Sequence, residues 1–491
     1  MTEPEASAPL EERVDTPHTI ALPSGPLAYT ATAGTVIVRD DEATPLASMF
    51  YLAYVAERSE GALRRPITFL FNGGPGSASL WLNIGGFGPR RAPTSTPRAT
   101  PPAPYTVVDN PYTLLSESDL VFLDAPGTGY SRLLGDTRPD QVWGVDQDVD
   151  AFARAITRYL TITNNWNAPR FLFGESYGTT RASALAHRLQ NQGLDFNGVV
   201  LLSTMLNWAE NNLGLDQEHI NLLPSFAATA WYHGRSGSGA ASVDQAIAEA
   251  KDFAQGDYAR ALQLGDRISA EEEDAVADRF AALTGLPKDE VLAKHFRIGM
   301  EPFRYALLKA EGRVVGRFDT RFIADHQYVV GNGSHDPATD DAATAGVNSA
   351  HLSTFREIVG GELGYRSDLH YRHLHNMPIS RAWDWKHKAP GIDAPMPVPD
   401  VSLDLSAALR RNPNLQVAVM GGVYDLATPF FGAEVDIAKL YLAPALRENI
   451  TFRFYESGHM TFVDEQIVAQ MHEDLRAFYA RATDHEPVSF D

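Results

Sequence analysis

A serine between two glycines stands in the segment Gly174-Glu175-Ser176-Tyr177-Gly178, which matches the pattern G-x-S-x-G. This pattern marks a tight turn from a strand into a helix, and the turn leaves no room for side chains at the two glycines. A short apolar run precedes the segment and helix-forming residues follow it, which is the context that the turn requires. We therefore predict that Ser176 is a nucleophile in a strained conformation. The alternative is a purely structural turn rich in glycine.

A serine hydroxyl becomes a good nucleophile only when a base takes its proton, so a histidine and an orienting acid must accompany it. In folds with this turn, the chain order is serine, acid, histidine. Asp425 follows an apolar run at 417–420, and His459 follows another at 450–455. Both lie beyond the C-terminal ends of predicted strands, where α/β sheets place their sites. We predict a triad of Ser176, Asp425 and His459; the alternative is that the acid and the histidine are ordinary turn residues.

The negative charge that develops during acyl transfer needs two backbone N–H groups for its stabilisation. One belongs to the residue after the nucleophile, Tyr177. A glycine-rich loop at 72–76, with the sequence NGGPG, follows the apolar run at 67–71. Glycine lets a substrate approach the backbone closely, so we predict that this loop supplies the second N–H group. An ordinary glycine-rich turn is the alternative.

Strands and helices must alternate around these motifs to hold them. Residues 18–56 alternate apolar and polar positions in short runs, which Gly25, Gly34 and the pair Asp40-Asp41 separate; this is typical of antiparallel strands joined by turns. The later apolar runs are typical of buried parallel strands, and helical patterns lie between several of them. These runs cover 67–71, 120–123, 171–173, 199–202, 417–420 and 450–455.

Residues 206–395 lack this regular alternation and show mostly helix and loop. Ser269 and Glu272 there form a predicted capping box at a helix start. We predict that 206–395 is an inserted, mainly helical cap on a core formed by 18–205 and 396–491. The helical patterns in the insertion cover 243–253, 257–264 and 270–283.

The composition excludes several classes of protein. The 491 residues carry a net charge of −21, and nucleic-acid binding depends on basic side chains, so we expect no nucleic-acid partner. The chain has no cysteine, which excludes disulfides, thiolate metal sites and cysteine nucleophiles. No apolar run approaches the roughly 18 residues of a membrane span, so we expect no membrane partner.

Residues 1–17 are acidic and rich in proline, and they lack the basic start and apolar stretch of a signal peptide. We predict a disordered tail there and a cytoplasmic location. An exported form that has lost its leader stays open as an alternative, and so does a homodimer.

His373 and His375 could share a strand face and bind a metal. No carboxylate stands at a suitable spacing, so we expect no metal and no cofactor.

Five segments in this order resemble the serine carboxypeptidases: FNGGPGSASLW, FLDAPGTGYS, FGESYG, GGVYDLATP and SGHM. They are spread over residues 71–460 and cover the catalytic core, but not the insertion. The resemblance, to a bacterial-type member, implies the α/β-hydrolase fold, with a mixed, mostly parallel sheet and helices on both faces. It also implies a serine-type carboxypeptidase that cleaves peptides with a free C-terminus.

The resemblance implies roles beyond the triad. In the family, residues matching Gly74 and Tyr177 supply the oxyanion N–H groups, residues matching Asn72, Gly73 and Glu175 bind the substrate and its terminal carboxylate, and a residue matching Met460 lines the site. Glu175 must be protonated to donate to a carboxylate, which a buried position favours. The resemblance therefore implies a preference for acidic pH. A structural hydrogen bond beneath the turn is the alternative role for Glu175.

Three positions depart from the family pattern. Leu70 stands where tryptophan is usual, Gly86 where glutamate is frequent, and Ser77 where cysteine is common. The first two belong to the network that binds the carboxylate, whereas the triad is unaffected. An esterase or acyltransferase on the same scaffold therefore stays open. A non-catalytic binding protein is a further alternative, against which the triad residues argue.

Overall fold

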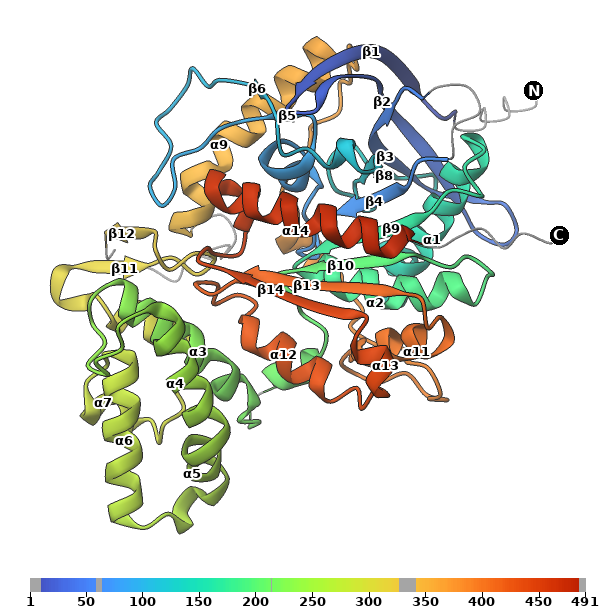
Figure 1. Cartoon of the computed structure of the whole chain (residues 1–491). Helices are drawn as coiled ribbons and strands as arrows, with labels where there is room; N and C mark the ends of the chain where they lie inside the picture. The colour runs from blue at the N-terminus through green and yellow to red at the C-terminus, as the bar shows by residue number, and fades with distance from the viewer. Residues whose placement is uncertain (1–9, 59–63, 213, 326–340, 485–491) are drawn as a thin grey trace.

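A ten-stranded mixed sheet forms the centre of the computed structural model, which describes residues 10–58, 64–212, 214–325 and 341–484 (Figure 1). The strand order is β1-β2-β3-β7-β4-β9-β10-β13-β14, and β8 pairs with β3. The pairs β1–β2, β2–β3 and β3–β7 are antiparallel, whereas the pairs from β7 through β14 are parallel. The predicted mixed, mostly parallel sheet is confirmed.

The strands of this sheet have the following bounds: β1 Arg13–Leu22, β2 Gly25–Arg39, β3 Pro45–Ala56, β4 Ile67–Phe71, β7 Asp119–Leu123, β8 Arg132–Leu133, β9 Arg170–Glu175, β10 Gly198–Leu202, β13 Gln416–Gly422 and β14 Ile450–Tyr455. Two small hairpins lie outside the sheet, formed by β5 (Arg90–Arg91) with β6 (Val108–Asp109) and by β11 (Arg313–Val315) with β12 (Ile323–Asp325). All the apolar runs predicted as parallel strands are strands of the sheet.

Both faces of the parallel strands are buried, which explains their nearly continuous apolar sequences. In β10, Val199 and Leu201 join the core on one face, and Val200 and Leu202 join the core on the other. The first core is covered by α1 (Val145–Ile162), α2 (Tyr177–Gln190), α11 (Ser402–Arg411) and α12 (Phe430–Ala438). The second is covered by α14 (Glu465–Thr483) and the single-turn helix η1 (Trp81–Phe87), and Figure 1 shows α14 across the sheet from α2.

Two predictions at the N-terminal edge are wrong. The tail was predicted to extend to residue 17, but β1 begins at Arg13, where it pairs with β2; residues 1–9 lie outside the described residues. Gly34 was expected to separate two strands, yet β2 continues through it. A side chain at Gly34 would stand 2.9 Å from the Tyr51 hydroxyl, so this glycine permits close packing instead of a turn.

The first part of the predicted insertion forms a helical lobe beside the sheet (Figure 1). Its own apolar core includes Phe226, Phe280 and Phe303, and it continues into Tyr424 and Phe430 of the sheet domain. The predicted capping box at the start of α6 is confirmed. The lobe helices are α3 Gln217–Tyr232, α4 Val243–Phe253, α5 Ala259–Leu264, α6 Ala270–Thr284, α7 Lys288–Ala293 and α8 Met300–Ala306.

The rest of the predicted insertion does not belong to this lobe. The helix α9 (Ala342–Glu357) and the segment after it pack on the sheet domain, where Phe355 and Tyr371 join the same core as Phe50. The prediction of one cap over 206–395 is therefore wrong for its second half.

The remaining helices are α10 Asn376–Ala382 and α13 Pro444–Arg447. The short helical segments are η2 Leu114–Ser116, η3 Pro139–Gln141, η4 Trp208–Asn211, η5 Ala254–Tyr258, η6 Gly265–Arg267, η7 Lys309–Glu311, η8 Ile358–Glu362 and η9 Thr461–Val463.

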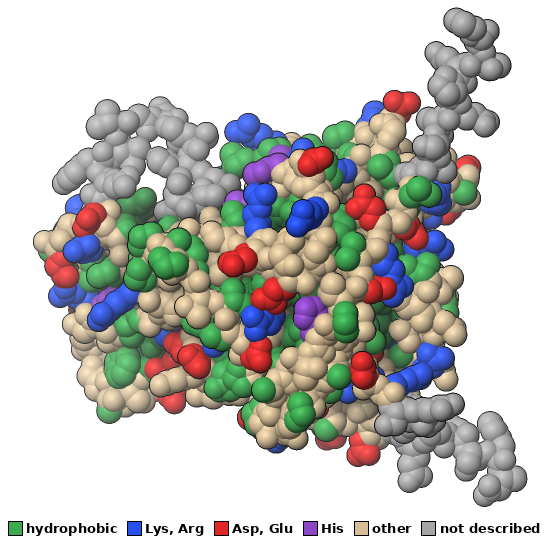
Figure 2. Space-filling model, turned by 90° about the horizontal axis from the view of Figure 1, so that it is seen from above, with side chains coloured by type: hydrophobic (Ala, Val, Ile, Leu, Met, Phe, Trp, Pro, Cys, Tyr) green, Lys and Arg blue, Asp and Glu red, His purple; other side chains and the backbone are tan. Residues whose placement is uncertain are grey.

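The acidic surplus of the chain does not form a single patch on the face that Figure 2 shows. Acidic and basic side chains are interspersed there, with apolar side chains between them. Within the described ranges, the helices are all too short or too polar to cross a membrane.

Candidate active site

Ser176 stands at the junction of β9 and α2, in the conformation predicted for it. Its φ of 61° and ψ of −129° lie outside the regions that residues with side chains ordinarily adopt, so the predicted strain is confirmed. The two flanking glycines are required by close packing. A side chain at Gly174 would overlap the carbonyl group of Gly178, and one at Gly178 would stand 2.7 Å from the carbonyl oxygen of Phe71.

His459 and Asp425 are hydrogen-bonded to each other. Nδ1 of His459 lies 2.7 Å from Oδ2 of Asp425, and the Thr428 hydroxyl donates to the same carboxylate oxygen at 2.7 Å. The other oxygen accepts from the N–H groups of Ala427 at 2.8 Å and Thr428 at 3.2 Å. Asp425 is fully buried. Because the carboxylate engages Nδ1, the Nε2 atom is the ring nitrogen left for a reacting group.

Ser176 and His459 line one pocket with a volume of about 310 Å³, and Asp425 lies behind the histidine. The structure thus brings together the three residues predicted as a triad, from the ends of three strands. Among the described residues, no side chain forms a hydrogen bond with the Ser176 hydroxyl. Such a bond commonly tightens only when substrate is bound.

Two backbone N–H groups are available beside the serine. Tyr177 is the first residue of α2, so its N–H group has no acceptor within the helix. Gly74 lies in the loop after β4 with a φ of 113°, and in the described chain its N–H group donates to no protein acceptor. A side chain at Gly73 would stand 2.7 Å from the N atom of Gly178, so that glycine lets the loop lie against the turn. Tyr177, Gly73 and Gly74 all line the pocket.

Glu175 and Asn72 form a buried pair at the floor of the pocket. The Asn72 amide donates to the Glu175 carboxyl and accepts from the N–H of Leu82 at 3.1 Å. Burial raises the pKa of Glu175 to about 8; the charge of Asp425 also raises it, whereas His459 and the Asn72 hydrogen bond lower it. Glu175 is therefore protonated at neutral pH and can donate a hydrogen bond.

A buried ion pair supports the Asn72 loop from beneath. Arg181 of α2 and Asp148 of α1 are 2.6 Å apart, and both side chains are inaccessible to solvent. A further N–H group of Arg181 donates to the Asn72 carbonyl at 2.8 Å. This pair thus fixes the loop relative to α2, and no local sequence pattern indicated it.

The surroundings of His459 change its basicity in opposite directions. Burial lowers its pKa, but the charge and hydrogen bond of Asp425 raise it. Arg317 opposes them through its positive charge. The net pKa is above the ordinary value for histidine, which suits a base that must hold a proton during the reaction.

The backbone of His459 is held from two sides. Its N–H group donates to the carbonyl of Phe318 at 2.6 Å, and its carbonyl accepts from the Ser203 hydroxyl at 2.7 Å. The Phe318 ring lies 5.0 Å from the imidazole ring. A side chain at the preceding Gly458 would collide with the Phe318 carbonyl, which explains the glycine in this motif.

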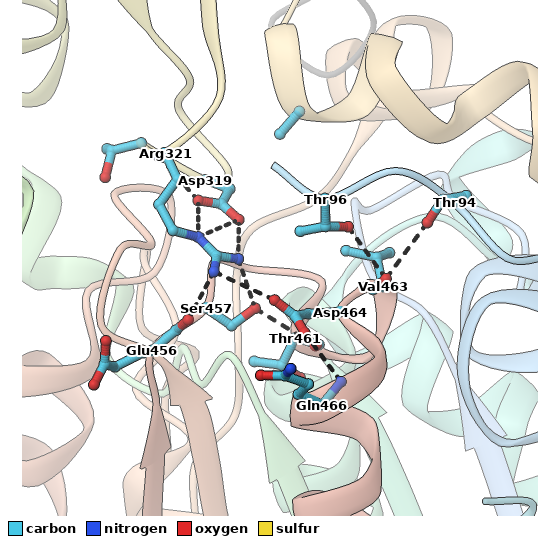
Figure 3. Close-up of polar contacts among 12 residues, drawn as sticks. Thr94, Thr96, Asp319, Arg321, Glu456, Ser457, Thr461, Val463, Asp464 and Gln466 are labelled. Atoms are coloured by element: carbon cyan, nitrogen blue, oxygen red, sulfur yellow. Dashed lines mark hydrogen bonds and ion pairs between the residues drawn. The ribbon is translucent and has the colours of Figure 1, made fainter. Parts of the chain in front are cut away.

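Figure 3 shows how the segment from Glu456 to Val463, within which His459 stands in the sequence, contacts its neighbours. Arg321 pairs with Asp319 at 2.8 Å and donates to the Glu456 carbonyl at 2.8 Å, which joins the segment between β11 and β12 to the loop. On the other side, the Thr96 hydroxyl donates to the Val463 carbonyl at 3.2 Å. These contacts restrict movement of the histidine.

Several pocket residues were missed by the sequence reasoning. Met460 lines the pocket, and so do Ser77, Trp81, Ala427 and Thr428, which stand within the segments FNGGPGSASLW and GGVYDLATP. Most of the other walls come from segments without a recognisable motif. The additional lining residues are Ser77, Trp81, Met205, Trp208, Asn211, Arg317, Phe318, Thr344, Leu374, Asn376, Met377, Ser380, Ala427 and Thr428.

His373, one of the two histidines considered as metal ligands, lies beside an aromatic ring. The His373 ring lies 6.4 Å from the ring of Trp81. Across the parts of the chain that the structure describes, no three His, Cys, Asp or Glu side chains are grouped so that they could hold a metal ion.

Comparisons with known proteins place this site in context. The model of the serine carboxypeptidase family matches residues 24–233. The structure is similar to that of Kex1Δp, a prohormone-processing carboxypeptidase from Saccharomyces cerevisiae, with 15% identity, 91% of each chain covered and a TM-score of 0.56. It is less similar to a proline iminopeptidase from Mycobacterium smegmatis, with 11% identity, 91% of this chain and 98% of that chain covered, and a TM-score of 0.38. No curated protein matches the sequence.

The family match confirms the resemblance to the serine carboxypeptidases. The similarity to the carboxypeptidase structure confirms the α/β-hydrolase fold, while the bacterial type stays a prediction.

Proposed function

We propose that this chain, an enzyme of the serine carboxypeptidase family, hydrolyses C-terminal peptide bonds through Ser176, His459 and Asp425. The observation that carries the proposal is the 2.7 Å hydrogen bond between His459 and the buried Asp425, at a pocket that also holds Ser176 in a strained turn. A histidine oriented by an acid, beside a serine that lines the same pocket, is the arrangement that activates a hydroxyl for acyl transfer.

The proposed reaction has two halves. Ser176 Oγ attacks the scissile carbonyl while Nε2 of His459 takes the hydroxyl proton, and Asp425 stabilises the resulting imidazolium. The N–H groups of Tyr177 and Gly74 stabilise the oxyanion. The imidazolium then protonates the leaving amine, which departs as the C-terminal residue and leaves an acyl-enzyme. Water, deprotonated by His459, hydrolyses the ester and restores Ser176.

Asn72 and Glu175 are the proposed partners of the terminal carboxylate, with Gly73 and Met460 beside them. Only protonated Glu175 can donate to a carboxylate, and an ionised one would repel it. With a pKa of about 8 for Glu175, carboxylate recognition extends from acidic pH to neutral pH and fails above pH 8. Recognition of peptide acids is thus favoured on the acidic side of this value.

The proposal is tested with an N-blocked dipeptide and the same dipeptide amidated at its C-terminus. The wild-type enzyme is expected to release the C-terminal residue from the acid much faster than from the amide. Ser176→Ala should abolish turnover of both and labelling by a fluorophosphonate. Equal turnover of the acid and the amide would refute carboxylate recognition, and an unlabelled wild-type chain would refute the nucleophile.

An esterase or acyltransferase is the second candidate, favoured by one observation in η1. At Gly86, where the family frequently has glutamate, a side chain would stand 3.0 Å from the Phe462 ring, which fills that space. A second carboxyl group for substrate binding is therefore absent at this position. Rapid cleavage of esters without release of amino acids from any peptide would support this candidate over the first.

A further inference from the structure

Arg317 lines the active-site pocket, and within the described ranges no acceptor forms a hydrogen bond or an ion pair with its guanidinium group. The residue lies between β11 and β12, directly before Phe318, whose carbonyl binds the His459 N–H group. Its Nε atom is buried without an acceptor. Among the described residues, none forms a hydrogen bond or an ion pair with the guanidinium. Burial lowers the pKa of Arg317, so the surrounding protein offsets its desolvation only in part.

Other arginines in this part of the fold are fully engaged. Arg321 pairs with Asp319 and binds the Glu456 carbonyl (Figure 3). Arg304 pairs with Glu301 at 2.7 Å and donates to the Val315 carbonyl at 3.0 Å. The Nε atom of Arg317 thus differs from the side chains of these two arginines, which find acceptors in the same part of the fold.

The carboxylates around Arg317 are already used by other donors. Both oxygens of Glu301 accept from Arg304. Asp341 accepts from Arg304 at 3.3 Å and from the backbone N–H of Arg317 itself. Asp425 is bound to His459 and its own loop. These groups act on the guanidinium through their charge but leave its N–H donors free.

The backbone contacts of Arg317 fix its position next to the catalytic groups. Its N–H group binds Asp341 at the start of α9, and its carbonyl accepts from the N–H of Leu426 at 3.1 Å. The guanidinium carbon lies 5.6 Å from the centre of the Phe318 ring. Arg317 is therefore attached to the loops that carry both the acid and the histidine of the site.

The charge of the pocket points to the ligand that would satisfy this group. Of the side chains that line the pocket in the described ranges, Arg317 is the one with a permanent positive charge, and Glu175 is neutral below pH 8. The other walls are apolar, amide or hydroxyl groups, with the exception of His459. A planar guanidinium matches a carboxylate with two parallel hydrogen bonds.

We propose that Arg317 binds a carboxylate of the substrate, an assignment that rests on the proposed peptidase function. A peptide can present this group in two ways, as its terminal α-carboxylate or as the side chain of Asp or Glu next to the scissile bond. In either case Arg317 supplies the positive charge that Asn72 and neutral Glu175 lack. It is a specificity-determining residue for the reaction.

The test compares Arg317→Gln and Arg317→Lys with the wild type on matched peptides. One pair differs only in a terminal acid or amide, and the other only in Glu or Gln beside the scissile bond. Loss of a hydrogen-bonded charge is expected to lower kcat/KM for the recognised carboxylate about 10- to 100-fold. The ratio within each pair cancels any change in His459 basicity. Arg317→Lys keeps the charge and should retain part of the discrimination.

Arg313→Gln is the matched control, because Arg313 carries the same charge on β11 and pairs with Asp325 at 2.6 Å on the surface. A lowered acid-to-amide ratio in Arg317→Gln assigns the terminal carboxylate, and a lowered Glu-to-Gln ratio assigns the side chain. Unchanged ratios in both Arg317 variants, with folding verified by thermal unfolding, overturn the proposal.

A second readout separates this proposal from the peptidase function. Two fluorophosphonates, one ending in a carboxylate and one in its amide, label Ser176 without peptide turnover. The wild-type enzyme could cleave no peptide and still be labelled faster by the carboxylate probe than by the amide probe. If Arg317→Gln then removes that preference, the Arg317 assignment holds while the peptidase function fails. Equal rates of labelling with both probes in wild type and variant contradict the assignment.

Discussion

Replacement of Glu175 by glutamine tests the protonation state on which carboxylate recognition depends. Glutamine has the shape of a protonated glutamate and keeps a hydrogen-bond donor at every pH. The wild-type side chain is 2% exposed and has a pKa of about 8. The rise of this pKa from the ordinary glutamate value of 4.5 corresponds to about 5 kcal/mol in favour of the protonated form.

The size of the effect follows from the protonated fraction. With a pKa of about 8, about 99% of Glu175 is protonated at pH 6 and about one tenth at pH 9. The kcat/KM of the wild type for a peptide acid, divided by that for the matching amide, should therefore be constant up to about pH 7 and fall about tenfold per pH unit above pH 8. The ratio for Glu175→Gln should stay constant across the same range.

The assay is a set of kcat/KM measurements for the N-blocked dipeptide acid and amide from pH 5 to pH 9.5. The amide reports the ionisation of His459, which both substrates share, so the ratio isolates Glu175. A wild-type ratio that is constant to pH 9.5, or that already falls near the ordinary glutamate pKa, would refute the reasoning. The same fall in Glu175→Gln would assign the titration to another group.

Three further outcomes are expected. Asp425→Asn should lower kcat about 10⁴-fold, because the histidine loses its orienting acceptor, with an unchanged thermal unfolding midpoint as the check on folding. Arg181→Met should lower the free energy of unfolding by about 3–5 kcal/mol, since it leaves Asp148 buried and unpaired; urea unfolding measures the loss, and the double variant with Asp148→Leu should recover part of it. Ser269→Ala should cost about 1 kcal/mol by removing the cap of α6 and leave peptidase rates unchanged, which a loss of activity would contradict.

The core of the fold and the motif residues of the site follow from local sequence patterns. A parallel strand that is buried on both faces needs an apolar run, and a tight turn needs glycine at fixed places, so β9, Gly174 and Gly178 could be predicted from a few neighbouring residues. Asp425 and His459 were found because each follows such a run. Gly34 was misinterpreted because a glycine in a strand looks the same as a glycine in a turn, and only its distance from Tyr51 distinguishes them.

The remaining features depend on contacts between distant segments. Phe355 packs with Phe50 in one core although a helical pattern alone cannot show which surface the helix meets. The pair of Arg181 and Asp148 joins two helices through charges that look like ordinary surface residues in the sequence. Arg317 has no motif around it, and only the described structure shows that its buried Nε atom lacks an acceptor.

The contact of Phe318 with His459 bears on how this enzyme could be engineered. Here Phe318, in the segment that follows the helical lobe, binds the backbone N–H group of His459. An exchange that removed this segment would therefore also remove a contact that positions the proposed base. A chimaera that replaces the helical lobe of this chain should have its C-terminal junction before Gly316, so that residues 316–322 of this chain are kept. Within that boundary the helices α3 to α8 can be replaced as one piece, provided that the new lobe covers Tyr424 and Phe430.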